Sequence, residues 1–349
     1  MDALAAPAVQ VVLPPELEAT TPAEHRGMAR DDVRMLVVRP GLMEHRWARD
    51  IADALEPGDL VVVNTTATVP AALDGARYDG RPATVHVAPA LDDGSWVVEV
   101  RRPDNRGPAE DVHVGETLCL PGDLLLHITA AHPDVYAVSS RLWRATPVPG
   151  RPVIPYLQQH GRPVTYGYVD HRYPLADYQT VFAADPGSSE MASAGRPFTT
   201  DLVTRLVAKG IGVAPIVLHT GLSSPEAHEP PTAERFRVPE ATAAQVNATI
   251  AAGQRVVAVG TTVVRALESA ADVDGIVHAA EGWTDLVLGP DRPAGVVNGL
   301  LTGWHAPEAS HLLLLEAVAG RDLVRVSYPE ALDHRYLWHE FGDVALYLP

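Results

Sequence analysis

Apolar residues in the second half of the chain fall into runs whose spacing predicts alternating helices and strands. Thr199 to Lys209 has helical spacing and stops at Gly210, and residues 211–218 (IGVAPIVL) follow as a buried strand. The alternation continues as helix, strand, helix and strand over residues 240–252, 255–259, 262–271 and 284–288. Such alternation implies a largely parallel sheet with helices on its faces.

The first 150 residues follow other patterns. Residues 33–39 (VRMLVVR) and 59–64 (DLVVVN) predict strands, and Arg46 to Leu55 has the spacing of a helix between them. From residue 67 to 150 the apolar runs are short and separated by turn residues, and the strand-like ones are 84–88, 95–101, 124–129 and 135–139. Short strands at regular spacing are typical of a small barrel or sandwich. The proline-rich stretch Pro147–Pro155 then predicts a linker.

Together these patterns predict an α/β body with a mostly parallel sheet and an inserted small β-barrel domain. We expect the body to comprise residues 1–66 and 151–349 and the barrel residues 67–150. Two domains suit a chain of 349 residues, since a domain averages about 150. Apolar runs such as Leu312–Leu315 are far shorter than the roughly 20 residues of a membrane span, and the N-terminus lacks the basic start of a signal peptide. With one cysteine, Cys119, neither an intrachain disulfide nor a cysteine zinc site is possible, so the expected location is the cytoplasm.

The net charge and the absence of common motifs reduce the number of function classes that suit the sequence. The net charge of −17 counts against a polynucleotide partner unless basic side chains gather locally in the folded chain. The sequence contains no GxGxxG after a strand, no GxxxxGK[ST], no HExxH and no GxSxG, which argues against P-loop, serine-hydrolase and zincin chemistry. The 15 histidines are scattered without ligand spacing, so no metal cofactor is expected.

One turn carries candidate chemistry. The strand at 255–259 ends in Gly260-Thr261-Thr262, and ligands of such sheets bind outside the carboxyl ends of the strands. Thr261 can cap the following helix, whose free N–H groups suit a carboxylate or phosphate. Arg265 lies in the first helical turn, where the helix dipole disfavours a cation, so an anionic partner is one explanation for it. The alternative is a surface ion pair between Arg265 and Glu268.

Several segments match one protein family in family order: LPPELEATTP, DLVVVNTTATVPAAL, YQTVFA, SAGRPFT, VLHTGL, VAVGTTVVRALES, GWTDLVL, LLTGWHAPEASHLLLLEAVAG and FGDVALYL. Together they resemble the S-adenosylmethionine:tRNA ribosyltransferase-isomerases of queuosine biosynthesis. The resemblance runs nearly end to end and is weakest through the inserted β region. It implies the fold described above and a transferase that uses S-adenosylmethionine as co-substrate, with tRNA as partner.

The implied reaction moves the ribosyl part of S-adenosylmethionine to an aminomethyl-deazaguanine base in tRNA, releasing adenine and methionine. The positive sulfonium acidifies the C–H of the adjacent ribose carbon, which a positioned base can then deprotonate. The site must therefore supply that base, an acid for the departing adenine and an anchor for the methionine carboxylate.

The resemblance assigns catalytic roles to four residues. His219, in the VLHTGL segment, and His305, in TGWHAP, are the candidates for base or acid, and His219 has the alternative role of a structural strand-end histidine. Arg265 is expected to hold the methionine carboxylate or ribose hydroxyls, and Glu268 to orient Arg265.

Further residues are assigned to the binding of S-adenosylmethionine. Thr261 and Thr262 join Arg265 in that role, and Trp304 is expected to stack on adenine unless it belongs to the core. Ser193, Gly195 and Asp285 complete this group, with a structural role as the alternative for Asp285.

The chain also departs from the family pattern. Pro197 stands where the family has a histidine, and proline can neither transfer a proton nor donate a hydrogen bond. Its neighbour Arg196 replaces a leucine, Pro231–Glu234 replaces methionine-histidine-serine-glutamate, and Ser189-Glu190-Met191 and His228-Glu229 are new. These changes indicate a divergent branch. They leave two alternatives open: an S-adenosylmethionine-using transferase or lyase with a small-molecule acceptor, and a binding protein that has lost catalysis.

Overall fold

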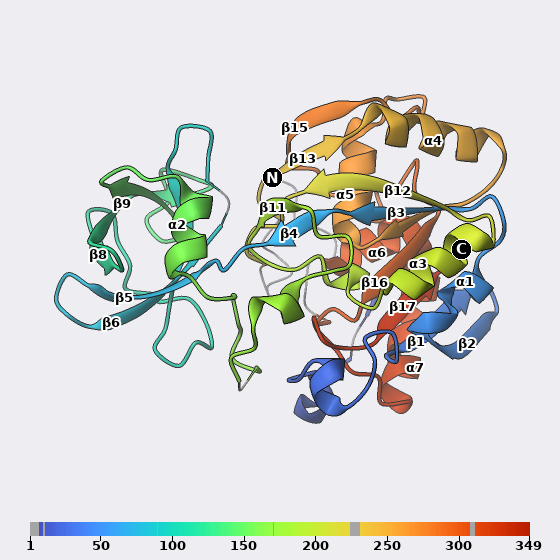
Figure 1. Ribbon diagram of the computed structural model, residues 1–349, viewed down its shortest axis with the longest axis horizontal. Coiled ribbons are helices and arrows are strands. Elements are labelled where there is room, and N and C mark those ends of the chain that lie inside the picture. Colours follow the sequence, from blue (N-terminus) through green and yellow to red (C-terminus); the bar gives the residue numbers. More distant parts are fainter. Residues whose placement is uncertain (1–6, 10, 89, 170, 224–230, 308–310) are drawn as a thin grey trace.

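The computed structural model describes residues 7–9, 11–88, 90–169, 171–223, 231–307 and 311–349. Figure 1 shows an α/β body on one side and a small barrel on the other, with strands β4 (Thr66–Thr68) and β11 (Asp185–Ser188) between them. The predicted combination of an α/β body with an inserted β-barrel is confirmed.

The described residues of the body form a nine-stranded sheet in the order β15-β13-β12-β3-β14-β16-β17-β1-β2. In that order the strands are Ala280–Thr284, Glu234–Val238, Gly212–Leu218, Leu60–Asn64, Val256–Val259, Gly299–Gly303, Val344–Tyr347, Arg34–Arg39 and Leu42–Trp47. The central strands β12, β3, β14 and β16 are parallel, as is the pair β17–β1, whereas β15, β13, β2 and the β16–β17 pair are antiparallel. The sheet is therefore mixed, with its parallel part at the centre.

Helices cover both faces of this sheet because its central strands are buried on both sides. In β3, Val61 and Val63 face a layer with α1 (Ile51–Ala54) and α3 (Thr200–Ala208). Leu60 and Val62 face the other layer, formed by α4 (Glu240–Ala251), α5 (Thr261–Ala270), α6 (His311–Ala319) and α7 (Arg321–Asp333). No helix among the described residues has the length and apolar character needed to span a bilayer.

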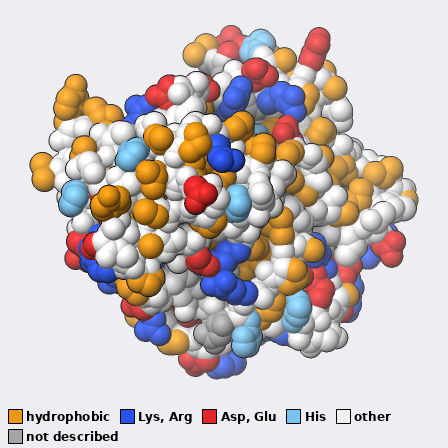
Figure 2. Space-filling view, turned by 60° about the vertical axis from the view of Figure 1, so that its left-hand side comes forward, with side chains coloured by type: hydrophobic (Ala, Val, Ile, Leu, Met, Phe, Trp, Pro, Cys, Tyr) orange, Lys and Arg blue, Asp and Glu red, His pale blue; other side chains and the backbone are white. Residues whose placement is uncertain are grey.

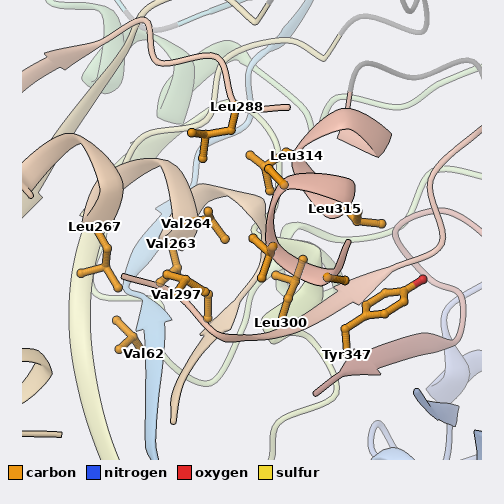
Figure 3. Packing of buried hydrophobic residues seen from close by; sticks show 14 of the residues in the cluster. Val62, Val263, Val264, Leu267, Leu288, Val297, Leu300, Leu314, Leu315 and Tyr347 are labelled. Carbon is orange, nitrogen blue, oxygen red and sulfur yellow. The ribbon is translucent and has the colours of Figure 1, made fainter. Parts of the chain in front are cut away.

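The position of α5 is set by its apolar stripe. Figure 3 shows Val263, Val264 and Leu267 of this helix in the same layer as Val62 of β3 and Leu300 of β16. Full burial of one such side chain stabilises the fold by about 1.5–3 kcal/mol. The N-terminus of α5 is thereby fixed at the carboxyl edge of the parallel strands.

The barrel is closed by six strands of the described chain in the order β10-β7-β6-β5-β8-β9. These strands are Leu142–Val148, Trp96–Arg101, Pro82–Val87, Ala72–Arg77, Thr117–Leu120 and Leu124–His132. Helix α2 (Val153–His160) packs on the barrel through Tyr156 and Leu157. The stretch predicted as a linker, Pro147–Pro155, is therefore the end of β10 and the first turn of α2.

Three other local predictions were wrong. Residues 135–139 form turns in which Tyr136 and Val138 are 91% and 98% exposed, so their apolar alternation reflects no buried face. The helix expected from Arg46 to Leu55 is the end of β2 followed by a 3-10 turn and the short α1. The strand expected at 284–288 ends at Thr284, and the residues after it have irregular backbone.

Candidate active site

A cavity of about 970 Å³ opens at the carboxyl edge of the parallel strands. Residues at or just after the ends of β12, β14 and β16 line it, at Thr220–Ser223, Gly260–Thr262 and Thr302–Ala306. Barrel residues such as Arg101 and Arg141 complete its wall. The volume falls in the range of about 300–1,000 Å³ that small-molecule sites occupy. The location agrees with the expected binding edge of the sheet.

Gly260 makes the turn between β14 and α5. Its φ of +92° lies in the region that favours glycine, and its N–H donates to the carbonyl of Leu301 at 2.8 Å. Gly260 itself is the N-cap residue and no side chain caps the helix, so the predicted capping by Thr261 was wrong. Asn64 Nδ2, at the end of β3, donates to Leu218 O at 2.8 Å and lies 3.3 Å from Thr262 Oγ1. The ends of β3 and β12 are thereby tied to the start of α5.

Arg265 is part of the cavity lining, but only 5% of the residue is exposed. It forms an ion pair with Glu234, the first residue of β13 and the last residue of the segment Pro231–Glu234 that departs from the family pattern. It also donates to three carbonyl oxygens, those of Thr232, Thr284 and Leu286, at 3.2, 3.0 and 3.1 Å. Because these donors have protein partners, the expected role of Arg265 as a carboxylate anchor stays a prediction.

Glu268 does not pair with Arg265. Its carboxylate accepts hydrogen bonds from three consecutive backbone N–H groups, those of Gly295, Val296 and Val297, at 2.9, 2.9 and 3.0 Å. The surface-pair alternative for Arg265 is therefore wrong, and so is the expectation that Glu268 orients Arg265. Glu268 fixes the segment that leads into β16, and it does not line the cavity.

His305 lines the cavity beside a second histidine that the sequence did not single out. The rings of His305 and His311 are parallel within 2° and their centroids are 4.6 Å apart. His305 Nε2 lies 3.1 Å from Thr302 Oγ1. Burial lowers the pKa of His305 well below its ordinary value and that of His311 to about 4. Both imidazoles are therefore neutral near pH 7.

His219 is held away from this cavity. It follows β12 and packs against Gly187 of β11, where an added Cβ would approach its Nδ1 to 2.6 Å. Its buried Nδ1 has no hydrogen-bond partner among the described residues, and burial lowers its pKa. The structure does not bring His219 and His305 together on one wall.

Of the residues expected to bind S-adenosylmethionine, Thr261, Thr262, Arg265, Ser193 and Trp304 line the cavity. Gly195 is buried and Asp285, directly after β15, is exposed, and neither residue lines the cavity.

Trp304 is only 1% exposed. Its ring centroid lies 5.2, 5.8 and 5.7 Å from those of Tyr328, Tyr336 and Trp338. Most of that indole therefore belongs to the core.

The replaced family positions have mainly structural surroundings. Arg196 is 3% exposed and donates to Glu24 at 2.8 Å and to the carbonyl of Asp177 at 3.0 Å. Although burial alone would raise the pKa of Glu24, hydrogen bonds from Arg196 and Arg30 lower it to about 2. Pro197 is buried next to Arg196 and does not line the main cavity. His228 and Glu229 lie outside the described residues.

The sequence did not identify two carboxyl groups of the cavity as site residues. Glu190 accepts from the phenol of Tyr166 and from the N–H and Oγ of Ser223, at 2.9 and 2.5 Å for the latter two. Glu340 accepts from the phenol of Tyr168. Glu190 had appeared only as a departure from the family, and Glu340 gave no signal because its surroundings come from distant segments.

One group of described residues has the spacing of metal ligands, but it lies outside the cavity. One ligand atom each of His45, Glu330 and His334 lies within 4.8 Å of the others, at β2 and the C-terminal end of α7. The group is partly exposed, and its members also pair directly with one another.

Charged side chains on the face shown in Figure 2 are mixed. Lysine and arginine side chains form separate small groups there, with acidic and apolar side chains between them. At the cavity rim the exposed Arg102 and Arg106 come from the barrel. This face thus combines local basic groups with the strongly acidic total charge.

The chain matches the family described as "Queuosine biosynthesis protein" over residues 9–347. It is 36% identical to the S-adenosylmethionine:tRNA ribosyltransferase-isomerase of Symbiobacterium thermophilum over 96% of this chain and 97% of that protein. The protein of the same name from Thermotoga maritima is 34% identical over 96% of this chain and 97% of that protein. The crystal structure of S-adenosylmethionine tRNA ribosyltransferase from Thermotoga maritima matches with a TM-score of 0.52 and 28% identity, covering 97% of this chain and 99% of that chain. The similarity therefore spans both the body and the barrel.

Proposed function

Because the chain belongs to the queuosine biosynthesis protein family, we propose that it transfers the ribosyl part of S-adenosylmethionine to a deazaguanine base in tRNA. Adenine and methionine are the released products, and the transferred ribosyl group is isomerised. The observation that carries this proposal is the convergence of Thr261, Thr262, Ser193 and His305 on one cavity at the carboxyl edge of the sheet.

The start of α5 suits the amino-acid end of the substrate. The first N–H groups of a helix have no intrahelical partner and carry partial positive charge, which favours a carboxylate. The hydroxyls of Thr261 and Thr262 add donors at the same place. Arg265 stands behind them and adds positive charge, although Glu234 shares that charge.

His305 is the base that this proposal prefers. It is neutral at physiological pH and faces the cavity, whereas His219 lies outside the lining. His305 would take the proton from the ribose carbon beside the sulfonium, and the parallel ring of His311 limits its rotation. A correctly placed general base typically contributes about 10²–10⁴-fold to a rate.

A second candidate function keeps S-adenosylmethionine but uses a small-molecule acceptor. The replacement of a family histidine by Pro197 and the net charge of −17 favour it. In that case turnover would not depend on tRNA.

The test is to incubate the purified chain with S-adenosylmethionine and measure free adenine and methionine, with and without tRNA that carries aminomethyl-deazaguanine. The main proposal expects release of both products in the presence of that tRNA. Product release that is indifferent to tRNA supports the small-molecule acceptor. Binding without any product release, under every acceptor condition, would leave a binding protein.

A further inference from the structure

We propose that Glu190 and Glu340, together with the aromatic rings beside them, form an acceptor subsite for a planar base that carries a protonated primary amine. The inference rests on the proposed function, since it names the residues that hold and activate the second substrate. Within this subsite Glu190 is the carboxyl group, held in place by hydrogen bonds, that binds the ammonium group, and Glu340 is the group that removes a proton from it.

The aromatic part of the subsite is a row of rings from two distant segments. Tyr166 and Tyr168 lie with their centroids 6.3 Å apart and their planes 23° apart. Tyr168 in turn stacks on His339 at 4.3 Å and 18°. All three side chains line the cavity. Such near-parallel rings suit a flat heteroaromatic ligand, which can stack along the same direction.

The two carboxyl groups face the same cavity as this row. Glu190 and Glu340 are half-buried, and among the described residues neither forms an ion pair with lysine or arginine, whereas Glu99 and Glu234 of the lining do. Glu99 pairs with Arg101 and Arg141, and Glu234 pairs with Arg265. Glu18 pairs with His339, so Glu190 and Glu340 are half-buried acids of the lining that are available to meet a cationic ligand.

Their surroundings give the two acids different tasks. Burial raises the pKa of Glu190, and the three hydrogen bonds that it accepts from Tyr166 and Ser223 oppose that rise. Glu340 accepts one phenol hydrogen bond, and burial raises its pKa to about 7. The charge of Glu190 adds to that rise, whereas the Tyr168 hydrogen bond and the charge of Arg196 oppose it. A carboxyl group with a pKa near neutrality is suited to proton transfer at physiological pH.

The chemical step is one proton transfer. An N–H bond of the ligand ammonium breaks and an O–H bond forms on Glu340, which becomes a neutral acid. The amine nitrogen recovers its lone pair and can then attack the ribosyl carbon. The remaining groups near Glu340 are His339 and its partner Glu18, 3.4 Å from His339 Nε2.

Binding is tested first, with two free bases as probes: 7-aminomethyl-7-deazaguanine and its 7-methyl analogue. Calorimetry on the wild-type chain should show at least about tenfold tighter binding of the amine, the size of one charge-assisted contact. Glu190→Gln and Glu340→Gln should each reduce that preference, while the exposed control Glu56→Gln should keep it. Equal binding of the two bases by the wild-type chain would overturn the inference.

Turnover is tested next, with a tRNA stem-loop that carries the aminomethyl base. Glu340→Gln should lower kcat/KM by about 10²-fold and remove the acidic limb of the pH profile near pH 7. Glu190→Gln should mainly raise the KM for the acceptor. Tyr168→Phe removes a hydrogen bond that lowers the pKa of Glu340, so its acidic limb should move to higher pH. Thermal melting identifies any variant that fails to fold.

The outcomes separate this inference from the proposed function. If the wild-type chain turns over the stem-loop and Glu340→Gln keeps both its rate and its pH profile, the inference is wrong while the function stands. If the wild-type chain releases no adenine with any acceptor, the proposed function fails, and the calorimetric preference alone decides whether the amine subsite exists.

Discussion

Replacing Arg265 by methionine tests how much the ion pair and hydrogen bonds of this arginine stabilise the fold around the site. The substitution keeps much of the side-chain volume but removes the charge, leaving Glu234 without its partner and three carbonyl oxygens without their donor. Breaking a buried ion pair by removing one member costs about 3–5 kcal/mol, whereas an exposed pair contributes about 0–1 kcal/mol. We therefore expect Arg265→Met to lower the free energy of unfolding by about 3–5 kcal/mol.

Urea unfolding followed by tryptophan fluorescence measures this loss. The double variant Arg265→Met/Glu234→Met should recover part of it, because no buried charge is then left alone. It should remain about 1–3 kcal/mol below the wild type, since the N–H of Gly221 loses the carboxylate that accepts it at 2.9 Å.

The pH dependence gives an independent check. Burial raises the pKa of Glu234 and the charge of Arg265 opposes that rise, so in Arg265→Met the folded-state pKa goes up further. A raised folded-state pKa stabilises the fold at low pH and loses that effect as pH rises. The deficit of the variant should therefore shrink between pH 8 and pH 5. A loss below about 1 kcal/mol at pH 8, with no dependence on pH, would refute this account of Arg265.

Further predictions concern other parts of the site and its supports. His305→Ala should lower turnover by at least about 10²-fold with little change in calorimetric S-adenosylmethionine binding; equal losses in both would assign His305 to positioning. Gly260→Ala should lower the free energy of unfolding by about 1–2 kcal/mol, because alanine is strained at φ +92° and its Cβ would lie 3.4 Å from that of Ala194; an unchanged urea midpoint would contradict this. Arg196→Met should flatten the dependence of stability on pH between about 4.5 and 2, because the lowered pKa of Glu24 gives stability that is present above the unfolded-state pKa and lost as pH falls through about 2; acid titration of both proteins decides it.

The elements of the body could be predicted from sequence because their apolar periodicity and their end signals agree. Helix α3 begins after Thr199, whose Oγ accepts from the N–H of Leu202 at 3.2 Å, and ends before Gly210. The strand around residue 62 was predicted because both of its faces are apolar. Periodicity failed where apolar residues lie on irregular backbone, as at Leu286 and Leu288, which are buried without belonging to a strand.

The site could be predicted only where its residues share one local motif. Gly260, Thr261 and Thr262 were found because a strand, a turn and a helix follow one another in sequence. The partner of Arg265 could not be found, because Glu234 lies on a strand 31 residues away and the nearer Glu268 had the right spacing for a pair. Glu190 and Glu340 line the same cavity although they are 150 residues apart in the sequence, so no spacing rule connects them.

Two parts of the chain form the cavity wall. The inserted barrel supplies Arg101, Arg102 and Arg106, and the α/β body supplies the Gly260 turn. Trp283 Nε1 also reaches across to Asp92 of the insertion at 2.9 Å. Mutations confined to the insertion can therefore reshape the entrance for a large partner while leaving the pocket at the Gly260 turn intact. This division lets evolution change the ligand that the entrance accepts while the pocket at the Gly260 turn keeps its own ligand.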